Sequence, residues 1–138
     1  MLNLNSDFYK KLFYSLDNNA VIMRVEEDGI YHPIWCTREF AEMMESTIEE
    51  CLTMEKRFLE SIHREDRDKV EYLFKNHKTI DGSNNLTIRR YTFKNNLIWV
   101  NLHYTFVEDN GILYAYCNYL DVTLIKENER KVESLYQS

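Results

Sequence analysis

The spacing of hydrophobic residues changes twice along the chain, from an alternating pattern to a helical one and back. Two strand-like runs, 20–26 and 30–36, flank Asp28-Gly29, a pair that predicts a hairpin turn when alternating apolar residues lie on both sides. Pro33 lies inside the second run and has no backbone N–H to donate. We therefore expect that strand to be an edge strand or to carry a bulge.

Between residues 37 and 76 the apolar residues recur every three or four positions, which predicts several short helices. Thr37 is expected to cap the first of them. Ser61 or His63 is expected to cap the last, whose first turn carries acidic residues that suit the positive end of the helix dipole.

The alternating period returns in three runs, 86–93, 97–107 and 112–120, which predict a three-stranded meander. If Asn110-Gly111 is a two-residue turn, Asp109 pairs with Ile112 and fixes the register of the last hairpin. One face of this hairpin then collects the apolar residues and is expected to face the core. These residues are Ile98, Val100, Leu102, Tyr104, Phe106, Leu113, Ala115, Cys117 and Tyr119.

The reverse face of the same strands is too aromatic for a surface that meets only water. It carries Trp99, Asn101, His103, Thr105, Tyr114, Tyr116 and Asn118. An amphipathic helix predicted near the N-terminus is the natural cover, and its apolar side consists of Tyr9, Leu12, Phe13 and Leu16. We expect this helix, together with Trp99, Tyr114 and Tyr116, to supply a dimer interface.

Composition limits the class of protein. A chain of 138 residues with 44% hydrophobic content can bury one sizeable core, which predicts a single domain. The net charge of −6, with basic residues interspersed among acids, argues against nucleic acid as a partner. Three cysteines without a CxxC pair fit a reducing compartment, and no apolar run spans a bilayer or forms a signal peptide. A cytoplasmic protein without membrane insertion is expected.

Two motifs in this order of elements carry a family resemblance. "SIHREDRDKV" resembles the helix-opening segment of the PAS family, and "LIWVNLHYTFVEDNGILYAYCNYLDVT" resembles its last hairpin, which ends in an Asp-x-Thr triplet. Arg64 departs from the family pattern, in which Pro is frequent at this position. The resemblance implies an α+β fold: a five-stranded antiparallel sheet with helices on one face. It divides the chain into an N-terminal flanking helix (1–19), a PAS domain (20–123) and a C-terminal linker helix (124–138).

The linker helix has the sequence of a short coiled coil. Ile125, Asn128, Val132 and Leu135 follow spacings of three, four and three, while charged residues lie outside this seam. Asp121 and Thr123 precede it and have side-chain oxygens that can accept the N–H groups of its first turn. The alternative is a solvated helix that packs on its own domain.

The resemblance implies a sensory and dimerisation module of a bacterial signalling protein. In this family such helices pass signals into an output domain, a histidine kinase or a cyclic-dinucleotide enzyme. A homodimer joined to an output domain outside this chain is therefore expected, with the change relayed through Asp121, Val122 and Thr123.

Candidate cofactors and metals find little support. Flavin photoreceptors of this fold carry an Asn-Cys-Arg-Phe-Leu-Gln run, whereas Cys51 is followed by Leu52 and Thr53. Haem would need an axial histidine, and His63 and His77 are better explained by helix ends. The histidines and cysteines show no metal-ligand spacing. We expect no flavin, haem or metal.

The space between the core face and the helices could hold a small ligand or could be filled by side chains, and the sequence leaves both alternatives open. The residues expected near this space are Phe40, Met43, Met44, Ile48, Tyr104, Cys117 and Tyr119. A further alternative is a cone-shaped α+β enzyme resembling ketosteroid isomerase, which would need an acid pointing into the core. The predicted core face offers none, so a protein without catalytic activity is expected.

Overall fold

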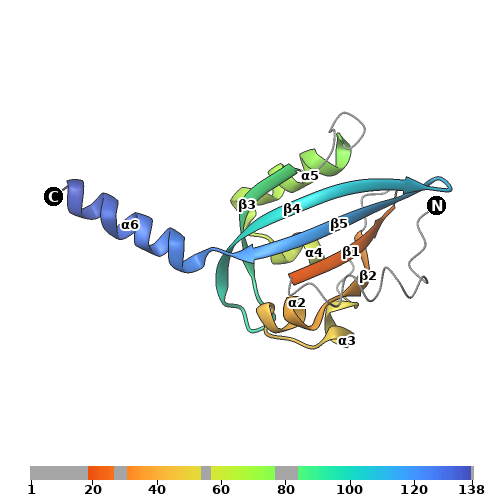
Figure 1. Ribbon diagram of the computed structural model, residues 1–138, viewed down its shortest axis with the longest axis horizontal. Helices are drawn as coiled ribbons and strands as arrows, with labels where there is room; N and C mark the ends of the chain where they lie inside the picture. Colours follow the sequence, from red (N-terminus) through yellow and green to blue (C-terminus); the bar gives the residue numbers. More distant parts are fainter. Residues whose placement is uncertain (1–18, 27–30, 54–56, 77–83, 138) are drawn as a thin grey trace.

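The computed structural model describes residues 19–26, 31–53, 57–76 and 84–137, and these form one five-stranded antiparallel sheet with helices (Figure 1). The order of strands across the sheet is β2-β1-β5-β4-β3. The strands are β1 (Asn19–Val25), β2 (Tyr31–Cys36), β3 (Asn84–Tyr91), β4 (Leu97–Asp109) and β5 (Ile112–Asp121). The N-terminal helix and the Asp28-Gly29 turn that the sequence predicts lie outside the described residues.

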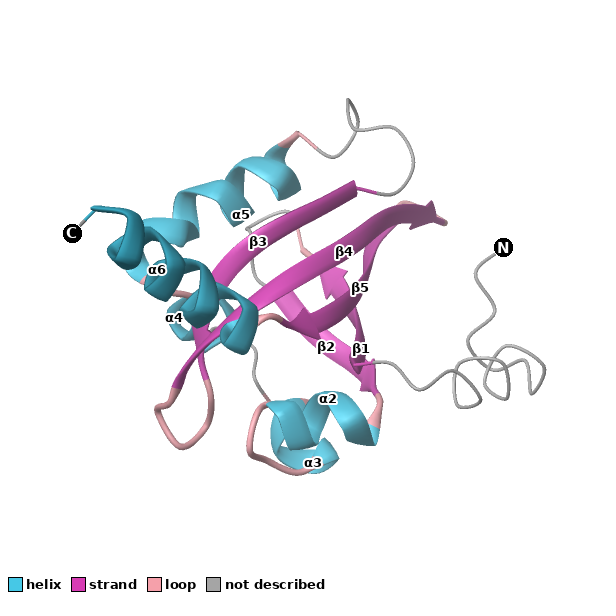
Figure 2. Cartoon of the chain, turned by 60° about the vertical axis from the view of Figure 1, so that its left-hand side comes forward, coloured by secondary structure: helices cyan, strands magenta, loops and turns pink. Residues whose placement is uncertain are grey.

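Short helices gather against one face of the curved sheet, and a longer helix leaves it (Figure 2). The short ones are α2 (Arg38–Met43), α3 (Ile48–Cys51), α4 (Arg57–Ser61), the 3-10 helix η1 (Arg64–Asp66) and α5 (Arg67–Lys75). The last helix, α6 (Thr123–Gln137), extends away from the globular part as a separate rod. The predicted α+β class and five-stranded sheet are confirmed.

The predicted register of the last hairpin is confirmed. Asp109 pairs with Ile112, and Asn110 and Gly111 have φ values of 51° and 78°, the left-handed conformations that a two-residue hairpin turn requires. This register places eight of the nine predicted residues in or against the core cluster, and the ninth, Leu113, is buried as well.

Strand β2 is an edge strand with an irregularity beside its proline, as predicted. Ile22 pairs with Trp35 but Met23 pairs with Pro33, so Ile34 has no partner in the ladder. Strand β3 ends at Tyr91, earlier than expected, because Thr92 begins a turn. The Thr92 hydroxyl accepts from the Asn96 N–H at 3.1 Å and donates to Glu45 Oε1 at 2.7 Å.

Two of the predicted helix caps are confirmed. Thr37 Oγ1 accepts from the Phe40 N–H at 3.2 Å, and His63 Nδ1 accepts from the Glu65 N–H at 3.2 Å. Ser61 was an alternative cap, but its hydroxyl donates to the Phe58 carbonyl at 2.6 Å. Of the two caps that the sequence left open, His63 is therefore the one that starts the helical segment.

Candidate functional site

The joint between β5 and α6 is fastened to strand β4 at Trp99. Asp121 Oδ1 accepts from the Thr123 N–H at 2.9 Å, which is the capping role expected of it. Thr123 does not cap the helix as predicted. Its hydroxyl accepts from the Trp99 N–H at 2.9 Å, and the Val122 N–H donates to the Trp99 carbonyl at 2.8 Å. The start of α6 is thus hydrogen-bonded to both backbone groups of a residue in the sheet.

The ring of Trp99 adds a second contact between the sheet and α6. The guanidinium carbon of Arg89 on β3 lies 5.0 Å from the ring centroid, and Lys126 Nζ in the first turn of α6 lies 5.5 Å from it. Cations at this distance are attracted by the electron-rich ring face. Trp99 therefore touches one cation of the sheet and one of the exit helix.

Arg89 also connects this joint to the helical layer. Its Nε donates to Asp66 Oδ2 at 3.0 Å, its backbone N–H donates to the same oxygen at 2.8 Å, and its Nη2 lies 3.0 Å from Glu65 Oε2. Contacts therefore run without a gap from η1 through Arg89 and Trp99 to Lys126. The residues of this path come from four separate elements of the chain.

Asp66 is one of the acidic residues predicted in the first turn of the last short helix, and its carboxylate is buried. Burial alone would raise the pKa of its carboxyl group, but hydrogen bonds from the Arg89 side chain and backbone outweigh burial and hold the pKa at about 2. Asp66 is therefore an ion-pair partner. A general base needs a raised pKa, so this carboxylate does not meet the requirement of the isomerase-like alternative.

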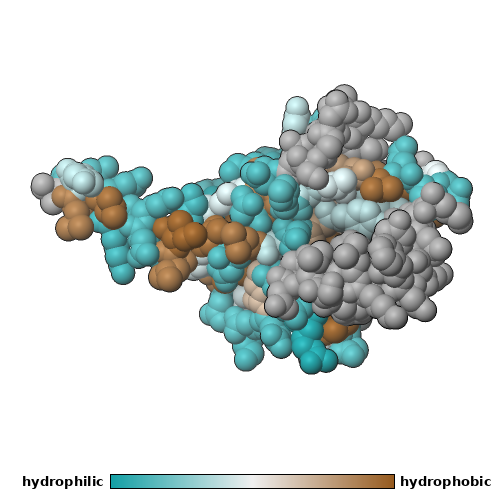
Figure 3. Space-filling model, viewed as in Figure 1, coloured by the Kyte–Doolittle hydropathy of each residue, from teal (hydrophilic) through white to brown (hydrophobic). Residues whose placement is uncertain are grey.

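Helix α6 presents an apolar side that its own domain leaves exposed. None of its described residues is buried, and the exposed fractions of Ile125, Val132 and Leu135 are 55%, 50% and 75%. Hydrophobic and hydrophilic surface alternates along the projecting rod (Figure 3). A shallow groove lies between Ile125, Asn128 and Val132, three of the four predicted seam residues.

The predicted pocket residues lie in the core between the sheet and the helices. Five of them are buried, namely Phe40, Met44, Tyr104, Cys117 and Tyr119. The other two, Met43 and Ile48, are partly buried and pack against the core. The ring centroids of Phe40 on α2 and Tyr119 on β5 are 5.4 Å apart, so side chains of the helix and the sheet are in direct contact there. The structure brings all seven residues together in or against one core cluster.

Arg90 is a buried cation inside this core that the sequence analysis missed. Its guanidinium carbon lies 5.1 to 5.7 Å from the ring centroids of Phe40, Phe58 and Tyr119, and its Nη2 donates to Ser61 Oγ at 3.0 Å. The Tyr119 hydroxyl is buried beside it, and no described group meets that hydroxyl in hydrogen-bond geometry. Burial raises the pKa of Tyr119 more strongly than the Arg90 charge lowers it. The core thus contains a polar region among aromatic rings.

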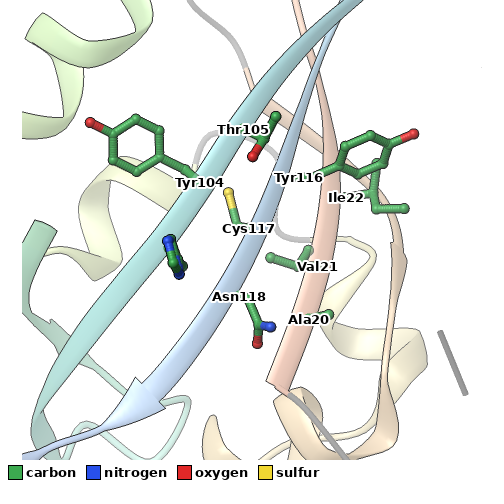
Figure 4. A pocket seen from close by; sticks show the side chains of 9 residues that line it. Ala20, Val21, Ile22, Tyr104, Thr105, Tyr116, Cys117 and Asn118 are labelled. Carbon is green, nitrogen blue, oxygen red and sulfur yellow. The ribbon is translucent and has the colours of Figure 1, made fainter. Parts of the chain in front are cut away.

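The reverse face of the sheet carries a hollow (Figure 4). Ile22, Thr105, Tyr116 and Asn118, from strands β1, β4 and β5, line it together with His103. The other proposed interface residues of this face, Trp99 and Tyr114, are half-buried. The predicted partners on the N-terminal helix, Tyr9, Leu12, Phe13 and Leu16, lie outside the described residues.

The described residues contain no group of three histidine, cysteine or acidic side chains arranged to hold a metal ion. His77, one of two histidines weighed as haem ligands, lies outside the described ranges. None of the helices in the described part of the chain is long and apolar enough to cross a membrane.

Similar proteins are found by comparing structures, and not by comparing sequences. No protein-family model and no curated protein matches the sequence. An RNA-binding light-oxygen-voltage receptor superimposes with a TM-score of 0.75 at 18% identity, covering 98% of this chain but 37% of the receptor. A light-oxygen-voltage domain studied with a flavin analogue superimposes with a TM-score of 0.68 at 13% identity, covering 99% of this chain and 100% of that domain.

A sensory box histidine kinase/response regulator from Burkholderia thailandensis gives a TM-score of 0.65 at 20% identity, covering 93% of this chain and 95% of that structure. These identities are low, so the likeness concerns the fold. The superpositions extend over 98% and 93% of this chain. The chain has the PAS fold.

Proposed function

We propose that this chain is a sensory and dimerisation module of a signal-transduction protein, in which a change in the globular part is passed to α6. The observation that carries this proposal is the joint at Trp99. Both backbone groups of Trp99 hold the start of α6, and the Trp99 ring touches Lys126. Any displacement of β4 at this point must therefore move α6 or break these contacts.

The path from η1 to α6 supplies a physical route for such a displacement. A shift of η1 would pull on Arg89 through its ion pair with Asp66, and Arg89 lies against Trp99. Because short helix shifts at an interface are a common form of switching, we propose that α6 changes its position or pairing when this path moves.

The downstream partner is proposed to be an output domain, a histidine kinase or a cyclic-dinucleotide enzyme. One of the similar solved structures is a sensory box histidine kinase/response regulator, which favours a histidine kinase as the output domain. No catalytic role is proposed for the chain itself.

The second copy of the chain is proposed to bind through the seam of α6 and the reverse face of the sheet. Ile125, Asn128, Val132 and Leu135 lie along one side of α6, and apolar residues at these spacings pair helices into a coiled coil. Trp99, Tyr114 and Tyr116 would add aromatic contacts.

Sedimentation analysis over a concentration series tests this assembly. We expect a reversible dimer for the full chain, weakened by Val132→Lys in the seam. Glu127→Lys, in the same helix but outside the seam, is the control and should leave the dimer intact. A monomer at the highest concentration would contradict the proposal, and so would equal loss in both variants.

A second candidate function is ligand sensing by the same fold. The buried Tyr119 hydroxyl beside Arg90 favours it, since a buried hydroxyl is normally hydrogen-bonded and a small polar ligand or water could supply the partner. Two of the similar structures are light-oxygen-voltage proteins, one of them studied with a flavin analogue. We nevertheless expect no flavin here.

Absorbance and native mass spectra of freshly purified protein distinguish these alternatives. A bare chain without visible absorbance supports the packing and dimerisation module. A species with added mass supports ligand sensing, and flavin or haem bands would overturn the expectation that the chain binds neither.

A further inference from the structure

The hairpin between β4 and β5 turns through an exposed Asn-Gly pair. Asn110 and Gly111 form its two-residue turn, with φ values of 51° and 78°, and both residues are exposed. A Cβ atom added at Gly111 would meet no described atom within 4 Å, so the space beside its backbone is open. Asn110 is thus followed by the residue type that places the least bulk next to its side-chain amide.

A second exposed asparagine has a similar backbone conformation but different surroundings. Asn95 has a φ value of 64° and lies between β3 and β4. The next residue, Asn96, carries a side chain, and its backbone N–H donates to Thr92 Oγ1 at 3.1 Å. The Asn96 carbonyl accepts from the Thr92 N–H at 2.8 Å. Thr92 therefore holds Asn96 on both sides, and the two asparagines form a matched comparison.

Gly111 has a conformational freedom that Asn96 lacks. The positive φ values at Asn110 and Gly111 are those of a type I′ turn, and rotation of the peptide plane between them gives a type II′ turn, in which φ is positive at the first residue only. Both types close two-residue hairpins, and glycine accepts either sign of φ. The rotation therefore leaves the strands paired and brings the Gly111 nitrogen toward the Asn110 side-chain amide.

We propose that Asn110 is a site of spontaneous deamidation, with water as the co-reactant. The Gly111 backbone nitrogen attacks Cγ of Asn110, the bond from Cγ to the side-chain nitrogen breaks, and ammonia leaves with the proton that the Gly111 nitrogen lost. Water then opens the resulting cyclic succinimide. Attack of water at Cγ gives aspartate, and attack at the Asn110 backbone carbonyl carbon gives isoaspartate. On either route one water is consumed and one ammonia is released.

The two products differ in their effect on the hairpin. Aspartate leaves the main chain unchanged, tolerates the left-handed conformation and adds one negative charge beside Glu108 and Asp109. Isoaspartate routes the main chain through the side-chain methylene, which lengthens a turn whose length fixes the register of β4 against β5. The isoaspartate form therefore loses pairing near Ile112, whereas the joint at Trp99 lies at the opposite end of β4 and stays intact.

The test incubates the folded full chain in mildly alkaline buffer and maps its peptides at intervals. Chromatography with mass spectrometry separates aspartate from isoaspartate at each asparagine. We expect the rate of conversion at Asn110 to exceed that at Asn95 by about tenfold or more, a barrier difference of about 1.4 kcal/mol. Gly111→Ala adds the missing Cβ and should slow conversion at Asn110 by a similar factor.

Alanine is strained at the positive φ of Gly111, so circular dichroism checks that this variant folds, and the wild-type rates do not depend on it. Amide hydrogen exchange of the separated forms should be faster at Ile112 in the isoaspartate form alone, with no change at Trp99. Equal rates at Asn110 and Asn95, no conversion at Asn110 in folded wild-type protein, or an unchanged rate in folded Gly111→Ala overturns the proposal.

Discussion

The hydroxyl of Thr123 accepts a hydrogen bond of 2.9 Å from the backbone N–H of Trp99, so the first residue of α6 is held by the sheet it leaves. The same hydroxyl donates to Asp121 Oδ1 at 2.6 Å. The Thr123 hydroxyl thus connects the start of α6 to the end of β5 and to the neighbouring strand β4.

Thr123→Val should loosen this joint. The substitution keeps the shape of the side chain but removes the hydroxyl, leaving the Trp99 N–H without its acceptor. We expect a loss of about 1 kcal/mol in the free energy of unfolding. Amide hydrogen exchange should rise at Trp99 and in the first turn of α6. Thr123→Ser retains the hydroxyl and should show neither effect, and equal exchange in both variants would contradict this assignment.

Lys126→Met should weaken the contact between α6 and the sheet while keeping the length of the side chain. An attraction between a partly exposed cation and an indole ring is worth about 0.5 to 1 kcal/mol. A double-mutant cycle with Trp99→Leu should recover a coupling energy of that size. Lys131→Met, at an exposed position of the same helix, should show no coupling to Trp99.

Asp66→Asn should be among the more damaging single substitutions. It leaves the Arg89 guanidinium without its buried counter-ion, and removal of one partner from a buried pair costs about 3 kcal/mol or more. Urea unfolding measures the loss. Asp68→Asn, an exposed carboxylate in the first turn of α5, is the control and should change the midpoint little.

The same carboxylate should make stability depend on acid pH. Its pKa is about 2 in the folded protein against an ordinary 3.8, so folding favours the ionised form. The contribution, about 2 kcal/mol, is present above pH about 4 and is lost as the pH falls toward about 2. Asp66→Asn should flatten the stability profile in this window, and an unchanged slope would show that other groups titrate there.

Tyr119→Phe should cost little in the bare chain. The hydroxyl is buried, and none of the described groups meets it in good hydrogen-bond geometry, so its removal relieves a desolvation penalty and loses the interaction with the neighbouring Arg90 side chain. We expect a change below about 1 kcal/mol in either direction. A larger loss would show that the hydroxyl is hydrogen-bonded in solution, as a bound ligand or water would require.

The strands were accessible to sequence reasoning because their signals are local. Asn110-Gly111 fixes a two-residue turn, and the turn fixes the register of every pair in the last hairpin. The caps at Thr37 and His63 were accessible for the same reason, since each side chain bonds a backbone N–H two or three residues away.

The path to α6 was not accessible, because its contacts join residues that are far apart in sequence. Asp66 and Arg89 are 23 positions apart, and Trp99 and Thr123 are 24 apart. Arg90 follows Leu86 and Ile88 in the alternation, which placed it on the inner face. Because charged residues usually lie at the surface, the alternation pattern alone does not predict that Arg90 is buried.

The pairing of the first strand with the last gives the fold a mechanical weakness. Asn19 opposes Tyr119, and the Asn19 side chain donates to the Tyr119 carbonyl at 3.1 Å. Because β1 and β5 are antiparallel neighbours inside the sheet, β1 begins at the same end of the sheet at which β5 leads into α6. A pulling force applied between Asn19 and α6 would therefore break the hydrogen bonds between β1 and β5 one after another. It would not load all of them in parallel, as a shearing force does.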